Sequence, residues 1–199
     1  MHTYSHAWVL LYAFIYFPWF TYLERHVTDN YFVIHSIFDD YIPFCEYFII
    51  PYLLWFAYIA VTLGYLFFND KQGFYKASAI MFSGMTIFLI ICTVFPNGLN
   101  LRPEVFTRDN FCIELVKRIY QTDTPTNVLP SLHVYNSICS RLIQKGSLVL
   151  SILIILSTMF LKQHSVVDVV AACVMAYFMY SLIYAQEGAK SPRLARQVI

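Results

Sequence analysis

The chain has 199 residues, of which 59% are hydrophobic and only 13% are charged. Soluble domains carry about 25% charged residues, and small domains expose a large share of their surface, so we expect an integral membrane protein rather than a soluble globule. The net charge of +1 provides no field that would attract a polyanion, which argues against a nucleic-acid partner. Counts of 6 Gly, 8 Pro and 5 Cys exclude collagen-like, disordered and disulfide-stapled classes.

Runs without Asp, Glu, Lys or Arg predict where the chain crosses a membrane. A spanning helix needs about 20 residues, and the runs that reach or approach this length are 1–23, 47–69, 77–101, 124–140, 146–161 and 169–186. We therefore predict an all-α polytopic protein, a bundle of six transmembrane helices that forms one domain over residues 1–199. The first run lacks the basic start and the cleavage site of a signal peptide, so we expect a retained helix.

The distribution of Lys and Arg predicts the orientation of the bundle. With six spans, both termini lie on one side, together with seven basic and two acidic residues. The opposite side carries six basic residues and the other ten carboxylates. The basic cluster of Lys190, Arg193 and Arg196 favours a cytoplasmic C-terminus in the cell membrane, with the first, third and fifth loops on the extracytoplasmic side.

Two of these loops are expected to contain short interfacial helices. Residues 31–38 of the first loop form one candidate. In the third loop, residues 111–120 place Phe111, Leu115 and Ile119 on one helical face, with charged residues elsewhere. Such a helix either lies on the membrane surface or is an ordinary solvated helix packed on the bundle, and both interpretations remain open.

His164 and Asp168 are the first candidate catalytic residues. They are four residues apart, so on a helix the carboxylate can accept the imidazole N–H and leave the other ring nitrogen free for attack. The alternative is a buried pair that only locks two helices together, but ionisable groups in membrane spans favour function. The pair supplies only two metal ligands, without a Cys-x2-Cys or His-Glu-x2-His run, so we predict neither a metal nor another cofactor.

His133 is the second candidate, in the segment Pro130-Ser131-Leu132-His133. Pro and Ser are typical helix-start residues, and the unpaired N–H groups of a helix N-terminus favour phosphate. The hydroxyl of Ser131 adds a donor, and His133 is placed to protonate a leaving oxygen. A capping Ser next to Pro is common by itself, so the weight of this motif comes from His164.

Together these residues resemble the membrane branch of the type 2 phosphatidic acid phosphatase superfamily, which also contains the vanadium haloperoxidases. The family pattern is Lys-x6-Arg-Pro, then Pro-Ser-x-His, then Ser-Arg-x5-His-x3-Asp. The second motif is complete here, the third runs from Ser157 to Asp168, and Arg102-Pro103 matches the end of the first, so the motif core covers residues 101–168. Phe95 and Thr158 stand where the family has Lys and Arg. The residues from Ser157 to His164 are similar to the corresponding segment of the inositol phosphorylceramide synthase-like branch.

The resemblance implies a metal-independent lipid phosphate phosphatase. His164 would attack phosphorus and form a phosphohistidine, Asp168 would orient it, and His133 would protonate the leaving alkoxide. The implied phosphate-binding residues are Arg102, Ser131, Lys162 and Ser157. In the synthase-like branch an alcohol replaces water, and the motifs do not distinguish the two acceptors. The partners are a lipid phosphate and membrane lipids, with the lipid and the oligomeric state left open.

A non-enzymatic alternative is a transporter or proton relay that uses His133, His164 and Asp168 as a titratable chain. It predicts an internal repeat or helices broken by Gly or Pro near the middle of the membrane, and the sequence shows neither. Haloperoxidase chemistry is disfavoured because those enzymes are soluble.

Overall fold

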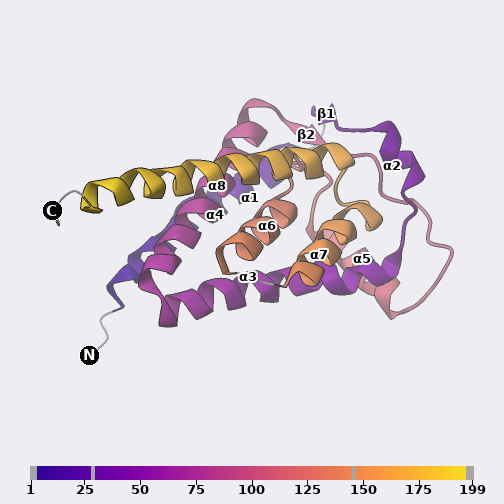
Figure 1. Ribbon diagram of the computed structural model, residues 1–199. Coiled ribbons are helices and arrows are strands. Elements are labelled where there is room, and N and C mark those ends of the chain that lie inside the picture. The colour runs from indigo at the N-terminus through magenta and orange to yellow at the C-terminus, as the bar shows by residue number, and fades with distance from the viewer. Residues whose placement is uncertain (1–3, 28–29, 145–146, 196–199) are drawn as a thin grey trace.

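The computed structural model describes residues 4–27, 30–144 and 147–195, most of which are helical (Figure 1). The elements in chain order are η1 (Ser5–Tyr12), α1 (Ala13–His26), β1 (Phe32–Val33), α2 (Ile37–Tyr41), η2 (Glu46–Phe48), α3 (Ile49–Asn69), α4 (Lys71–Val94), β2 (Asn97–Gly98), α5 (Phe111–Thr122), α6 (Leu132–Gln144), α7 (Leu148–Phe160) and α8 (Val166–Ala195). Figure 1 shows η1, the α3–α4 turn and the end of α8 at one end of the bundle, and β1, β2, α2 and α5 toward the other.

Within the described residues, three helices are long and apolar enough to cross a membrane: Glu46–Asn69, Lys71–Val94 and Val166–Ile183. They correspond to three of the six predicted spans. Leu148–Phe160 is apolar but shorter. Large apolar side chains are exposed along the helices, among them Phe14, Val61, Phe68, Val174 and Tyr177. A surface of this kind suits a lipid environment and is unusual in a soluble monomer.

The start and end of α4 differ from the predicted run 77–101. The helix begins at Lys71, because the Asp70 side chain accepts a hydrogen bond from the Gly73 N–H (2.9 Å). The predicted run starts only at residue 77, because the charged residues Asp70, Lys71 and Lys76 precede it. The helix ends at Val94, before Phe95-Pro96, and a residue that precedes proline is disfavoured in the α conformation.

The predicted helix over residues 31–38 is wrong. Phe32–Val33 forms β1, which pairs in parallel with Asn97–Gly98 of β2. The helix in this loop, α2, begins only at Ile37, where Ser36 and Asp39 form a capping box. The physical reason is long-range backbone pairing, which satisfies the backbone groups of residues 32–33 in a way that the local pattern does not indicate.

The first part of the predicted span 124–140 is also irregular, since α6 begins at Leu132. The Asn97 side chain accepts hydrogen bonds from the N–H groups of Val128 and Leu129, at 2.9 Å each. Thr126 forms an isolated bridge with Gly98. These contacts hold residues 126–129 as a non-helical segment that leads into α6, with Asn127 in a left-handed conformation (φ 56°).

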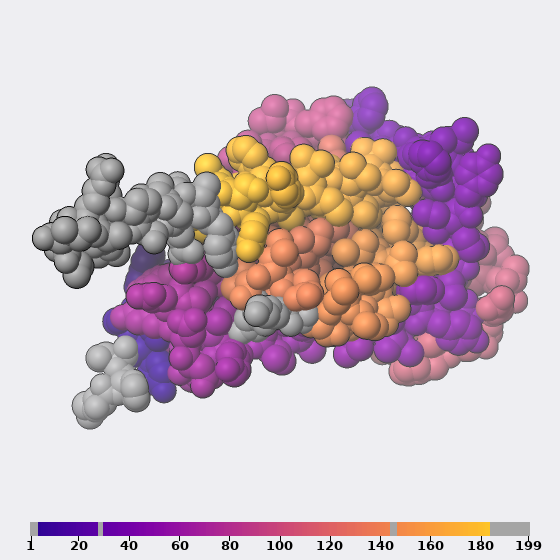
Figure 2. Space-filling view, viewed as in Figure 1, coloured from indigo at the N-terminus to yellow at the C-terminus, as the bar shows by residue number. Residues whose placement is uncertain are grey.

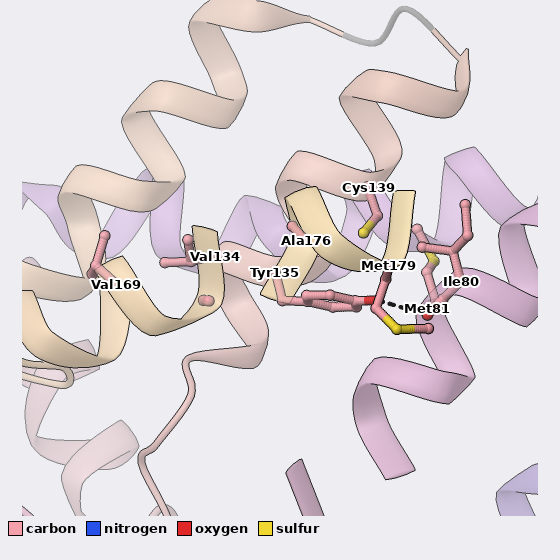
Figure 3. Packing of buried hydrophobic residues seen from close by; sticks show 9 residues of the cluster. Ile80, Met81, Val134, Tyr135, Cys139, Val169, Ala176 and Met179 are labelled. Atoms are coloured by element: carbon pink, nitrogen blue, oxygen red, sulfur yellow. Dashed lines mark hydrogen bonds between the residues drawn. The ribbon is translucent and has the colours of Figure 1, made fainter. Parts of the chain in front are cut away.

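α6 lies in the centre of the bundle and packs on α3, α4, α7 and α8. The buried core between α4, α6 and α8 consists of Ile80, Met81, Val134, Tyr135, Cys139, Val169, Ala172, Ala176 and Met179 (Figure 3). The Tyr135 hydroxyl donates to the Ile80 carbonyl (2.8 Å). A Cβ added at Gly84 of α4 would lie 2.1 Å from a ring carbon of Tyr135, so this close approach requires glycine. Figure 2 shows α8 (yellow) alongside the orange surface of α6.

The predicted amphipathic helix of the third loop is present as α5, and Asn110 caps its start. Ile113 and Val116 are buried, while Phe111 is 77% exposed. α5 packs on α3 and η2. Of the two interpretations left open by the sequence, this packing favours a helix docked on the bundle.

Candidate active site

His133 lies at the start of α6, where the chain enters the bundle. The hydroxyl oxygen of Ser131 accepts a hydrogen bond from the N–H of Val134 (3.4 Å) and so caps the N-terminus of α6. The imidazole stacks on Tyr52 of α3, with ring centroids 4.5 Å apart, and contacts the Trp55 ring at 4.3 Å. The helix start and two aromatic rings of α3 therefore fix the position of this imidazole.

His164 lies in the turn between α7 and α8. Lys162 adopts a left-handed conformation (φ 54°), and the His164 N–H donates to the Thr158 carbonyl (3.0 Å), so the chain reverses tightly after α7. His164 Nδ1 lies 3.4 Å from Oδ2 of the fully buried Asp168, slightly longer than an ordinary hydrogen bond. The rings of His164 and His133 are 5.9 Å apart between centroids. The structure thus brings the three predicted catalytic residues together.

Asp39 of α2 holds the start of α8 in place. It is 2% exposed, and its carboxylate accepts from the Ser165 hydroxyl (2.6 Å), the Val166 N–H (2.8 Å) and the Ser36 N–H (2.8 Å). The Ser165 N–H donates in turn to Asp168 Oδ2 (2.9 Å). Sequence reasoning missed Asp39, although the Ser36-x-x-Asp39 spacing is a capping-box signal.

A cavity of about 320 Å³ lies beside both histidines. Helices α1, α3, α4 and α5, the start of α6 and the segments around residues 122–128 and 163–164 line it. Its aromatic wall consists of Tyr16, Phe17, Phe20, Tyr52, Trp55, Phe56 and Phe88. Besides the histidines, its polar lining consists of Glu24, Thr122, Asp123, Thr124, Thr126, Asn127 and Gln163.

Arg102, a predicted phosphate-binding residue, does not line this cavity. Its guanidinium donates to the carbonyls of Tyr120 (3.3 Å), Asp123 (2.8 Å) and Thr124 (3.3 Å) and to Gln163 Oε1 (2.6 Å). It also lies over the Tyr120 ring, 4.5 Å from the centroid. Burial lowers the pKa of Arg102, and the nearby Asp123 opposes this effect. Arg102 therefore ties the end of α5 to the α7–α8 turn.

The other three predicted phosphate-binding side chains also lie off the cavity. Lys162 Nζ donates to the carbonyls of Asp39 (2.7 Å) and Ile42 (2.5 Å), at the end of α2. The hydroxyl of Ser131 caps α6, and that of Ser157 donates to a carbonyl of its own helix. Both serines are completely buried. None of the four predicted phosphate-binding side chains therefore lines the cavity beside the histidines.

Several buried polar atoms around the cavity have no hydrogen-bond partner among the described residues. On residues that line it they are Trp55 Nε1, His133 Nε2, His164 Nδ1, Gln163 Nε2 and Asn127 Oδ1, and Asp168 Oδ1 beside His164 is unpaired as well. Folded proteins leave few such groups unpaired, because each costs free energy. Because Arg102 occupies Oε1 of the Gln163 amide, Nε2 is its free end. These unpaired groups make the cavity the candidate ligand site among the described residues.

Two carboxylates, Glu24 of α1 and Asp123 after α5, make part of the cavity lining acidic. Glu24 Oε2 accepts from the Thr124 hydroxyl (2.5 Å). Burial raises the pKa of Asp123 to about 6, the charge of Glu24 adds to this, and Arg102 and His164 oppose it. None of the described residues that line the cavity is Lys or Arg.

Sequence reasoning did not assign Glu24, Asp123 or Gln163 to the site. Glu24 directly follows the charge-free run 1–23, and Asp123 directly precedes the run 124–140. Both carboxylates therefore border a predicted span on the side that carries the histidine motifs. That position is the signal that could have found them, whereas Gln163 had only its place beside His164.

No family model matches this chain, and no curated protein or solved structure matches it.

Proposed function

We propose that this chain is a membrane enzyme of the type 2 phosphatidic acid phosphatase superfamily that hydrolyses a lipid phosphate through a phosphohistidine. The observation that carries the proposal is the convergence of His133 and His164 on one cavity, with the buried Asp168 3.4 Å from His164 Nδ1. The motifs lie on different elements, α6 and the α7–α8 region, and meet in space. This arrangement supports acid–base and nucleophilic roles for the two imidazoles.

The reaction uses the two nitrogens of His164 differently. Nδ1 faces Asp168, so Nε2 attacks the phosphorus while the carboxylate stabilises the imidazolium that forms. The bond from phosphorus to the lipid oxygen breaks, and His133 donates a proton to the departing alkoxide. Water then attacks the phosphohistidine, passes a proton to His133 and releases phosphate. In a phosphotransferase an alcohol takes the place of water, with the same histidines.

The amide of Gln163 is the donor best placed for a phosphate oxygen. Its Nε2 is buried and unpaired, and it belongs to the residue directly before the nucleophile. Arg102 acts through this amide, as a positioning residue that holds Oε1. A preorganised donor of this kind stabilises the charge that builds on phosphorus in the transition state.

We further infer that α1, α6 and α7 are membrane spans in addition to α3, α4 and α8. This completes the six-span bundle, with both termini cytoplasmic and the histidines on the extracytoplasmic side of the cell membrane. The apolar surface of α1 and the apolar composition of α7 support this inference. The end of the bundle that carries α2 and α5 would then lie at the outer membrane surface.

The test is phosphate release from a panel of lipid phosphates by the purified protein in detergent, with and without diacylglycerol or ceramide as acceptor. His164→Ala should abolish both turnover and an acid-labile phosphoprotein. The matched control is His35, which forms an exposed pair with Asp40 (2.9 Å) away from the cavity. His35→Ala should keep wild-type activity. A phosphoprotein that persists in His164→Ala would refute the proposal.

A further inference from the structure

We propose that Asp39 is a positioning residue for the nucleophile, because its carboxylate fixes the residue that places Asp168 beside His164. Asp39 lies in α2 of the first loop, outside every segment that carries a motif residue, and it reaches a partner 126 positions later in the chain. The inference rests on the proposed function for the reaction that His164 performs. The contacts that hold the imidazole in place do not depend on that reaction.

The position of Asp168 depends more on Ser165 than on His164. The Ser165 N–H donates to Asp168 Oδ2 at 2.9 Å, whereas His164 Nδ1 lies 3.4 Å from the same oxygen. The first distance is that of an ordinary hydrogen bond, and the second is longer. Ser165 directly precedes α8 and Asp168 is its third residue, which is the spacing of a capping box. Ser165 therefore places the carboxylate that orients His164.

The Asp39 carboxylate fixes Ser165 in turn. Asp39 Oδ2 accepts from the Ser165 hydroxyl (2.6 Å), and Oδ1 accepts from the Val166 N–H (2.8 Å). The same hydroxyl oxygen accepts from the Val167 N–H (3.1 Å), so it has a partner as donor and as acceptor. Ser165 and Asp168 are completely buried and Asp39 is 2% exposed, so bulk water does not compete for these bonds. An anionic side chain at a helix N-terminus is also favourable.

The first loop holds Asp39 firmly enough for this role. The Ser36 N–H donates to Asp39 Oδ2 (2.8 Å) within α2, which orients the carboxylate from its own side. Two further contacts join this loop to the turn between α7 and α8: the Cys45 N–H donates to the Phe160 carbonyl (3.0 Å), and Lys162 Nζ donates to the Asp39 carbonyl (2.7 Å). The loop thus grips the turn at several points, and the Asp39 carboxylate is the part that reaches Ser165.

A positioning role differs measurably from a purely structural one. A carboxylate that only stabilised the fold would lower the free energy of unfolding when it is replaced, and the molecules that remain folded would react normally. If Asp39 positions the nucleophile, the folded protein itself changes, because Asp168 moves with Ser165 and no longer selects one tautomer of His164. The loss then falls on kcat rather than on KM, since the aromatic residues that line the cavity lie on other helices.

The experiment uses Asp39→Asn in the purified full-length protein in detergent. Both Asp39 oxygens accept from backbone N–H groups, those of Ser36 and Val166, so the amide of asparagine would place a donor against a donor in either orientation. With phosphatidic acid as substrate, we expect kcat to fall by roughly tenfold to a hundredfold, the usual effect of a displaced reacting group. KM should stay within about twofold of the wild-type value.

The independent readout is NMR of the imidazole nitrogens in protein with isotope-labelled histidine. The His164 signal is assigned by its absence in His164→Gln. In the wild-type protein we expect one neutral tautomer, with the proton on Nδ1 facing Asp168. In Asp39→Asn we expect a mixture of the two tautomers. This measurement needs no substrate and no turnover.

A second variant and a control keep the test independent of folding. Ser165→Ala removes the hydroxyl but retains the contact between Asp39 and the Val166 N–H, so it should give a similar loss of kcat, with little further loss in the double variant. It decides the question if Asp39→Asn does not fold. The control is Asp40→Asn, at the neighbouring carboxylate, which forms an exposed pair with His35 (2.9 Å) and should keep both kcat and the His164 signal. Thermal unfolding checks that each variant is folded.

The outcomes separate this inference from the proposed function. A lower Tm with wild-type kcat and an unchanged His164 signal in these variants overturns the inference, and so does a loss of kcat without a change in the signal. If the wild-type protein shows neither turnover nor a phosphohistidine, the proposed chemistry is refuted, while a mixture of His164 tautomers in Asp39→Asn still supports the positioning role. Turnover through His164 that is insensitive to both variants supports the chemistry and refutes the role of Asp39.

Discussion

Arg102 donates from its guanidinium to the side-chain oxygen of Gln163, with the two atoms 2.6 Å apart. The contact links residues that are 61 positions apart in the chain. The contact engages the guanidinium that the motif assigns to phosphate and fixes the orientation of the Gln163 amide.

This relationship predicts that Arg102 and Gln163 act as a unit. Gln163→Ala should lower kcat/KM by roughly 10²-fold, the usual effect of losing one preorganised donor. Arg102→Ala should cost a similar factor alone and little more in the Gln163→Ala background, because coupled residues are not additive. The measurement is a double-mutant cycle on kcat/KM. Fully additive losses would show that Arg102 contacts the substrate by itself.

The roles of His133 and Asp168 can be separated by comparing substrates that have poor and good leaving groups. His133→Ala should slow turnover of natural lipids much more than turnover of an aryl phosphate, because a good leaving group needs no proton. Asp168→Asn should reduce kcat by roughly 10³-fold or more, since the tautomer of His164 is no longer fixed. Steady-state kinetics with both substrate types test this. An equal loss on the two substrates in His133→Ala would remove its role as general acid.

Asp123 predicts a dependence of stability on pH. Its pKa is raised from 3.8 to about 6 in the folded protein, so the folded state binds the proton more tightly than the unfolded state. The free energy of unfolding should therefore fall as pH rises from about 4 to about 6, by up to about 3 kcal/mol from this group. Asp123→Asn should remove this part of the slope. Thermal unfolding in detergent between these pH values measures it, and identical slopes in both proteins would contradict the assignment.

Lys162 should affect stability rather than catalysis. Its ammonium donates to two carbonyls at the end of α2, and burial lowers its pKa while Asp39 and Asp40 oppose this. Lys162→Gln should lower the free energy of unfolding by about 1 kcal/mol and leave kcat/KM close to the wild-type value. A large loss of kcat/KM at unchanged stability would return Lys162 to the phosphate site that the motif implies.

The contact between α4 and α6 should tolerate only glycine at residue 84. Gly84→Ala places a Cβ 2.1 Å from a ring carbon of Tyr135, and such overpacking costs about 1–3 kcal/mol. Gly64 of α3 is a matched control, since a Cβ added there would meet nothing within 4 Å and alanine favours a helix. Thermal unfolding should therefore show a lower Tm for Gly84→Ala and an unchanged or higher Tm for Gly64→Ala.

The local features of the chain were predictable because they depend on residues close together in sequence. Composition and charge-free runs indicate a helical protein with membrane-crossing segments, and three helices long and apolar enough to cross a membrane are present among the described residues. The pairing of His164 with Asp168 follows from four-residue spacing. The start of α6 follows from Pro130-Ser131, whose hydroxyl caps the helix.

The lining of the cavity was decided by tertiary structure alone. In the sequence, Arg102 and Lys162 are both candidate phosphate ligands. In the structure, Arg102 instead donates to a carbonyl at the end of α5, and Lys162 donates to a carbonyl of α2. Glu24 reaches the site through contacts with Thr124 and Asn127, about a hundred residues away. Buried backbone carbonyls need donors and buried carboxylates need partners, and which group meets that need depends on which distant segments pack together. The motif residues by themselves thus determine a histidine site, whereas the packing determines that its surroundings are acidic and aromatic.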